Sequence, residues 1–221
     1  MLALEKGRAH LALPEAGQGA GVILLHAWWG LTDFFIAQAD RLAGEGFVVL
    51  APDVYHGATA NTVKEAEALN ETLQIDTVTA QLDEAVEFLK THPAVTSTQP
   101  GVVGFSLGAY LGLHMANRRP DEIGAMAAFY GTYDGGELSA MRAAFLGHFA
   151  ETDPYAPRED VEALEQTLTS MNLEATFHIY PGTGHWFFEA DRTAYHPESA
   201  RLAWERTLAF LRAKLEPTAS A

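Results

Sequence analysis

One serine stands in a pattern with chemical meaning. Ser106 is the centre of a G-x-S-x-G motif at residues 104–108, which follows an apolar run at residues 101–103 and precedes a helix-like segment. A serine on a tight turn between a strand and a helix leaves room only for very small residues two positions to either side. Gly104 and Gly108 meet that requirement, so Ser106 is the candidate nucleophile. The alternative is a glycine-rich turn whose serine has no chemical role.

A serine hydroxyl is a weak nucleophile until a base takes its proton, and a histidine held by a carboxylate is the expected base. The chain has nine histidines, and residues 180–185 read YPGTGH after the last predicted strand. A proline and two glycines permit a sharp turn there, so His185 is the candidate base. His92, His114 and His178 lie in segments with a helical or strand pattern, which favours surface or packing roles for them.

The acid of such a triad is expected between the nucleophile and the base in chain order, at the end of a strand. Asp153 meets both conditions because it follows the apolar run at residues 145–149, and Pro154 keeps the preceding residue extended. Asp134 also follows a strand-like run, but the two glycines after it favour a turn in which the aspartate bonds locally. Asp153 is therefore the preferred acid, and Asp134 is the alternative.

Acyl transfer also needs N–H donors for the oxyanion that develops on the substrate carbonyl. The N–H of Leu107, next to the nucleophile, is one candidate. The second is expected in the loop after the first core strand, where Ala27 and Trp28 remain alternatives. The candidates for lining an apolar substrate pocket, which core packing explains equally well, are Trp29, Tyr130 and Trp186.

The elements that must position these residues alternate between short apolar runs and longer segments of helical period. This order predicts an α/β fold, a mostly parallel sheet flanked by helices on both faces. Helical spacing of apolar residues marks residues 78–89, 161–171 and 200–215. Residues 173–180 alternate between apolar and polar, which indicates a strand near the sheet edge. The predicted strands are residues 22–25, 47–50, 101–105, 125–130, 145–149 and 173–180.

Composition narrows the classes of function. The chain has 221 residues, a net charge of −15 and no cysteine. Nucleic acid is not an expected partner, because its phosphates are bound by basic side chains. The lack of cysteine excludes thiolate catalysis and cysteine-ligated metals, and the histidines lack ligand spacing, so neither a metal nor a cofactor is expected.

No segment has the length of a membrane span, and the N-terminus lacks the apolar part of a secretory signal. The sequence therefore predicts a soluble, cytoplasmic protein without a membrane partner. Residues 1–221 are expected to form a single domain with a loose tail at residues 217–221. A homo-oligomer is possible, but no feature of the sequence indicates one.

Five ordered motifs span the chain from about residue 22 to residue 211. The motifs are VILLHAWWG at residues 22–30, APDVY at 51–55, GFSLG at 104–108, DPYAP at 153–157 and YPGTGH at 180–185. Together they resemble the dienelactone hydrolase family of α/β-hydrolases, which implies a nucleophile at Ser106, an acid at Asp153 and a base at His185. The resemblance also implies oxyanion donors at Trp28 and Leu107, and so chooses Trp28 over Ala27.

The implied function is serine-dependent hydrolysis of small carboxylic esters or lactones through an acyl-enzyme, without a cofactor. The alternatives are transfer of the acyl group to a thiol or peroxide by the same triad, and a non-catalytic protein that binds a small ligand in this fold.

The sequence departs from the founding enzymes of the family at three positions. Those enzymes have a cysteine nucleophile, a glutamate in the first oxyanion loop and an arginine four residues beyond the histidine. The corresponding residues here are Ser106, Ala27 and Glu189. We expect a substrate carboxylate to meet a like charge at Glu189, which argues against dienelactone as the substrate.

Overall fold

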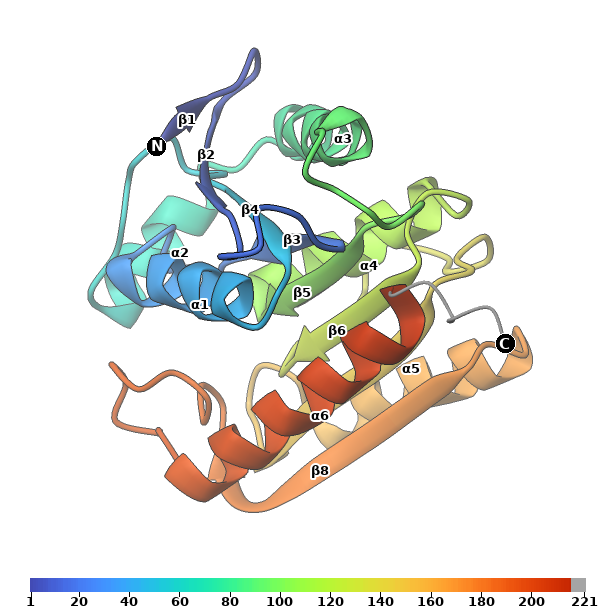
Figure 1. The fold of residues 1–221 in the computed structure, drawn as a ribbon. Coiled ribbons are helices and arrows are strands. Elements are labelled where there is room, and N and C mark those ends of the chain that lie inside the picture. Colours follow the sequence, from blue (N-terminus) through green and yellow to red (C-terminus); the bar gives the residue numbers. More distant parts are fainter. Residues whose placement is uncertain (216–221) are drawn as a thin grey trace.

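The strands form one eight-stranded sheet in a computed structural model that describes residues 1–215 (Figure 1). Their order is β1-β2-β4-β3-β5-β6-β7-β8. Strand β2 pairs antiparallel with β1 and β4, whereas all neighbours from β4 to β8 are parallel. The strands are β1 (Leu2–Ala3), β2 (Arg8–Ala12), β3 (Gly21–Leu25), β4 (Val48–Pro52), β5 (Gly101–Phe105), β6 (Ala125–Phe129), β7 (Ala144–Thr152) and β8 (Ala175–Gly184).

Six helices accompany the sheet in the described part of the chain. Helices α1 and α6 bury their apolar sides in one core, and α3, α4 and α5 bury theirs in a second core. Since the two cores lie on opposite faces of the sheet, the molecule has three layers, with α6 crossing one face in Figure 1. The helices are α1 (Asp33–Gly44), α2 (Val63–Asn70), α3 (Ile75–Thr91), α4 (Leu107–Arg118), α5 (Arg158–Ser170) and α6 (Pro197–Leu215).

The predicted fold class is confirmed, and each of the six predicted strands corresponds to one of the strands β3 to β8. The alternating segment is strand β8, which lies at the sheet edge as predicted. The sequence analysis missed β1, β2, α1 and α2. It also ended the last strand too early, because β8 continues to Gly184 and includes residues predicted as a loop.

Two further predictions concern the C-terminal tail and the lack of a membrane-spanning segment. The predicted loose tail at residues 217–221 lies outside the described residues. Among residues 1–215, no helix combines the length and the apolar character that crossing a bilayer requires.

The parallel strands direct their carboxyl ends to one edge of the sheet. In sheets of this kind, the loops at that edge form the ligand site. The loops after β3, β5, β6, β7 and β8 carry all the residues proposed above for chemistry. The fold therefore gathers at one edge residues that are far apart in the sequence.

Candidate active site

The turn between β5 and α4 holds Ser106 in an unusual backbone conformation. Its φ of 52° and ψ of −111° lie in a region that residues with a Cβ rarely adopt. A Cβ on Gly104 would lie 2.2 Å from the carbonyl oxygen of Gly108, and a Cβ on Gly108 would lie 2.2 Å from that of Leu25. Both glycines are therefore required for the turn to pack closely, because a side chain at either position would meet backbone atoms.

The register of β7 and β8 places Asp153 beside His185. Thr152 pairs with Gly184, and a register shift between Ala150 and Thr152 interrupts the regular ladder. Asp153 directly follows Thr152, and His185 directly follows Gly184, so the two side chains leave the sheet from neighbouring positions. Irregularities of this kind commonly redirect a side chain at the end of a strand.

The carboxylate of Asp153 is fixed by three hydrogen bonds. Its Oδ1 accepts from the N–H groups of Tyr155 at 2.8 Å and Ala156 at 3.0 Å, while Oδ2 lies 2.7 Å from Nδ1 of His185. The side chain of Asp153 is 1% exposed and that of His185 is 4% exposed. Because its other oxygen is occupied, the carboxylate can direct only Oδ2 at the imidazole.

The contacts continue from the imidazole to the serine. Nε2 of His185 lies 2.9 Å from Oγ of Ser106. A carboxylate only accepts hydrogen bonds, so Nδ1 carries the ring proton and Nε2 offers its lone pair to the hydroxyl. Asp134, the alternative acid, is exposed in the loop after β6 and makes no hydrogen bond or ion pair to His185 among residues 1–215. The geometry suits removal of a proton from Ser106.

The two predicted oxyanion donors follow neighbouring strands of the sheet, Trp28 in a loop and Leu107 at the start of a helix. Strands β3 and β5 pair through Leu25 and Gly104, and Trp28 and Leu107 each follow three residues later. Leu107 is the first residue of α4, and the first N–H groups of a helix have no partner within the helix and favour negative charge. The close contact of Gly108 with the carbonyl of Leu25 brings the loop and the start of α4 together.

Aromatic rings enclose the imidazole of His185. The Tyr130 ring lies edge-on at a centroid distance of 4.9 Å, and the rings of Tyr155 and Trp186 lie at 4.9 and 5.1 Å. Trp28 stacks on Trp186 at 6.1 Å. These rings limit the access of water to the imidazole and keep it facing Ser106.

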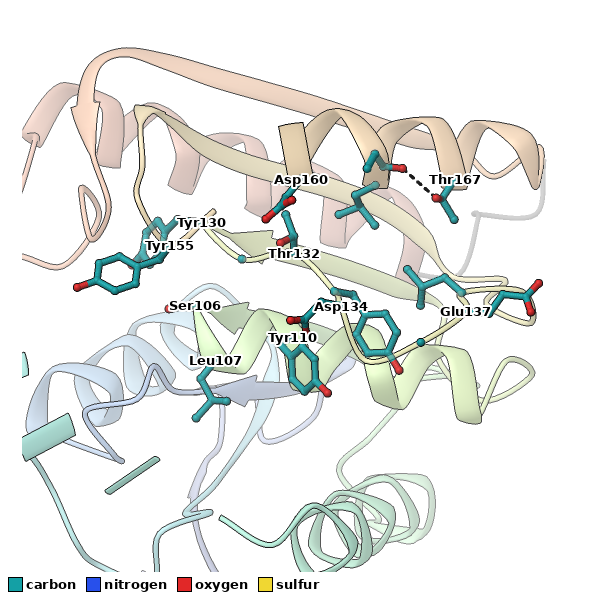
Figure 2. Close-up of a pocket in the computed structure, with 16 residues that line it drawn as sticks. Ser106, Leu107, Tyr110, Tyr130, Thr132, Asp134, Glu137, Tyr155, Asp160 and Thr167 are labelled. Carbon is teal, nitrogen blue, oxygen red and sulfur yellow. Dashed lines mark hydrogen bonds between the residues drawn. The ribbon is translucent and has the colours of Figure 1, made fainter. Parts of the chain in front are cut away.

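A cavity of about 420 Å³ opens beside Ser106. It lies between the start of α4, the loop after β6 and helix α5, and Figure 2 shows Tyr130 and Tyr155 near Ser106 at one end and Glu137 at the other. Of the three predicted pocket residues, Tyr130 lines this cavity, whereas Trp29 and Trp186 do not. Trp29 is only 2% exposed and is covered by the guanidinium of Arg192, which lies 3.8 Å from its ring centroid, so core packing accounts for it.

Several residues that line the cavity were not singled out from the sequence. Tyr155 belongs to the DPYAP motif, which is the only sequence signal that could have identified it. The contributions of α5 and of the loop after β6 depend on tertiary packing, and the sequence carries no signal for them. These additional lining residues include Tyr110, Thr132, Tyr133, Glu137, Asp160 and Thr167.

Glu189 does not face the cavity, so the expected repulsion of a substrate carboxylate at this residue is wrong. It is completely buried, and its Oε1 accepts a hydrogen bond of 2.8 Å from the Tyr130 hydroxyl. Burial raises the pKa of Glu189 to about 8, and the Tyr130 hydroxyl and the nearby Arg192 guanidinium offset part of this effect. Glu189 is therefore mainly uncharged at neutral pH.

Comparison with known proteins shows the family of this chain. The model of the dienelactone hydrolase family matches residues 8–215. The chain belongs to the dienelactone hydrolase family. Protein usf of Aquifex pyrophilus is 32% identical over 216 residues, which cover 94% of this chain and 93% of that protein. The carboxymethylenebutenolidase of Rhodococcus opacus is 29% identical over 215 residues, covering 90% of this chain and 83% of the other.

A solved structure extends the similarity to three dimensions. A dienelactone hydrolase-like promiscuous phosphotriesterase from metagenomic libraries superposes with a TM-score of 0.82 at 17% identity, covering 94% of this chain and 98% of the other. At that identity the likeness concerns the fold alone. As a dienelactone hydrolase family member the chain is a hydrolase, which confirms the family and enzyme class inferred from the sequence. The catalytic roles of the individual side chains stay predictions.

Proposed function

We propose that this protein hydrolyses small carboxylic esters or lactones through a covalent acyl-serine intermediate. One observation carries the proposal, namely the continuous contact from Asp153 through His185 to Ser106, with distances of 2.7 and 2.9 Å. A nucleophile, a base and an orienting acid in this order activate a hydroxyl for attack on a carbonyl.

The reaction follows from these contacts. Ser106 Oγ bonds to the carbonyl carbon while its proton passes to Nε2 of His185. The tetrahedral intermediate then breaks its bond to the alcohol oxygen, which takes the proton from the imidazolium. Water attacks the acyl-enzyme, giving its proton to His185, and Ser106 regains that proton as the carboxylic acid leaves. Asp153 stays ionised and stabilises the imidazolium, and no step needs a metal or another cofactor.

The negative charge of each tetrahedral intermediate needs donors that are in place beforehand. We assign this role to the N–H groups of Leu107 and Trp28, at the start of α4 and in the loop after β3. Loss of one such donor costs about 10²- to 10³-fold in kcat in comparable sites. The positive end of the α4 dipole adds to the same effect.

The negative charge of the cavity lining favours uncharged substrates over anionic ones. Asp134, Glu137 and Asp160 line it, and its described lining contains no lysine or arginine. The three carboxylates are exposed, so screening limits each interaction, but all of them disfavour an anion. The Rhodococcus opacus relative is named for a lactone that bears a carboxyl group, and we propose that this chain prefers uncharged esters or lactones instead.

Two chromogenic esters of similar length test the proposal. We expect 4-nitrophenyl butyrate to be hydrolysed with a kcat/KM at least about tenfold above that of mono-4-nitrophenyl succinate, which carries a carboxylate. Ser106→Ala is the control for both esters. Activity that persists in this variant contradicts the serine mechanism, whereas a preference for the succinate contradicts only the proposed substrate class.

The remaining expectations concern partners and location. We propose a small-molecule substrate as the partner, with neither nucleic acid nor a membrane required. The cytoplasmic location predicted from the sequence is tested by cell fractionation, and the oligomeric state by sedimentation.

A further inference from the structure

A buried histidine lies directly before the proposed oxyanion loop. His26 is 2% exposed and follows strand β3. Its Nδ1 lies 2.7 Å from the carbonyl oxygen of Ala27, and its Nε2 lies 3.4 Å from the backbone nitrogen of Val54. The ring therefore links the loop after β3 to the loop after β4. The mechanism proposed above assigns no role to this side chain.

The two contacts define one protonation state of the ring. A carbonyl oxygen only accepts and a backbone N–H only donates, so Nδ1 carries the proton and Nε2 accepts from Val54. Burial lowers the pKa of His26, partly offset by the Ala27 carbonyl and by Asp53, whose carboxylate is paired with Arg8 at 2.7 Å. Burial and the two hydrogen bonds therefore both favour the neutral ring with its proton on Nδ1.

The hydrogen bond to the Ala27 carbonyl also orients the Trp28 N–H, because the carbonyl and the N–H belong to one peptide group. The carbonyl of Ala27 and the N–H of Trp28 lie in the same plane and point in opposite directions. The Ala27 oxygen accepts a second hydrogen bond of 3.1 Å from the N–H of Gly30. Two donors on this oxygen set the rotation of the peptide plane, and thereby the direction of the Trp28 N–H.

Neighbouring bonds restrain the rest of the loop. The carbonyl of Trp29 accepts from the N–H of Ala60 at 2.9 Å, and the rings of Phe35 and Tyr55 lie 6.2 and 5.6 Å from the His26 ring. Both ring pairs are tilted, at 48° and 36°, so aromatic neighbours surround the imidazole in addition to the bonds at its two nitrogens. The imidazole can therefore serve as a rigid support for the Ala27–Trp28 peptide.

We propose that His26 is a positioning residue that, through its Nδ1–H bond to the Ala27 carbonyl, aims the Trp28 N–H at the oxyanion of the reaction. The inference rests on the proposed function, because it requires a tetrahedral intermediate formed at Ser106. It differs from a purely structural role in one respect. Loss of the Nδ1 bond should lower kcat while KM stays nearly unchanged, since the donor matters most in the transition state.

Two substitutions distinguish the roles of the two ring nitrogens of His26. His26→Asn places an amide near the position of Nδ1, and His26→Gln places one near Nε2. We expect His26→Asn to keep kcat within about threefold of the unsubstituted protein and His26→Gln to lose about 10- to 100-fold in kcat. Thr207→Val is the matched control, because it removes a buried hydroxyl in α6 that bonds to Ala203 and His148, away from the loop. This control should keep its kcat.

A measurement on the unsubstituted protein does not depend on the folding of any variant. With ¹⁵N-tryptophan labelling, addition of phenylboronic acid, which forms a tetrahedral adduct with an active serine, should shift the backbone amide of Trp28 downfield. An unchanged Trp28 amide in the presence of the adduct overturns the inference, as does a kcat for His26→Gln equal to that of His26→Asn. Either result leaves ester hydrolysis through Ser106 intact, although an unchanged Trp28 amide also removes Trp28 from the proposed oxyanion donors. Absence of both the adduct and Ser106-dependent hydrolysis refutes the proposed function itself.

Discussion

The buried carboxyl of Glu189 should make the stability of the protein depend on pH. Its side chain is inaccessible to water, with the Tyr130 hydroxyl at 2.8 Å and Nε of Arg192 at 3.7 Å from its two oxygens. Asp191 adds a second negative charge nearby. Burial is the largest of these influences and raises the pKa from 4.5 to about 8.

The sign and size of the effect follow from proton linkage. Between pH 4.5 and pH 8 the folded protein holds a proton on Glu189 that the unfolded chain has released, so the free energy of unfolding falls as the pH rises. The contribution is fully present below pH 4.5 and is lost as the pH passes about 8. At about 1.4 kcal/mol per pKa unit, about 2 to 3 kcal/mol should be lost between pH 5 and pH 7.

Urea unfolding of Glu189→Gln against the unsubstituted protein at pH 5, 6, 7 and 8 measures this contribution. Glutamine resembles the protonated acid and does not ionise, so the variant should gain about 2 to 3 kcal/mol relative to the unsubstituted protein between pH 5 and pH 7. Glu71→Gln removes an exposed carboxyl and is the control. Parallel pH dependences for the Glu189→Gln variant and the unsubstituted protein would refute the reasoning.

Two further substitutions test the geometry of the site. Asp153→Asn should keep the hydrogen bonds from the N–H groups of Tyr155 and Ala156. The asparagine presents an N–H to Nδ1 of His185, which favours the wrong tautomer of the imidazole. We therefore expect a loss of about 10⁴-fold in kcat with an unchanged thermal midpoint. A loss below tenfold contradicts the role of the acid. Gly108→Ala should cost about 1 to 3 kcal/mol in urea unfolding and most of the activity. Gly44→Ala, whose added Cβ has no neighbour within 4 Å, is the matched control, and equal effects of the two would contradict the close contact.

Much of the fold follows from the sequence because parallel strands buried on both faces must be apolar throughout. Strands β3 and β6 are completely buried and appear in the sequence as continuous apolar runs. Strand β8 has one face packed on α5 and is only partly buried, which gives the alternating pattern of an edge strand. The glycines around Ser106 were predictable because a side chain at either position meets backbone atoms.

The errors arise where tertiary contacts decide the structure. Strand β2 has the mixed sequence RAHLA and is defined by its pairing with β4, about forty residues away. The burial of Glu189 depends on Tyr130 and Arg192, which come from another loop and a later turn. A sequence position gives the residue type but neither its exposure nor its charge state, so the repulsion expected at Glu189 could not be checked without coordinates.

Covalent labelling tests the central claim most directly. A fluorophosphonate reacts much faster with a serine whose proton is removed by a neighbouring base than with other hydroxyls, and its adduct is located by peptide mass spectrometry. We predict one adduct per chain, on Ser106, with loss of ester hydrolysis in proportion to labelling. An adduct on another residue, or full hydrolysis by the fully labelled protein, would contradict the account.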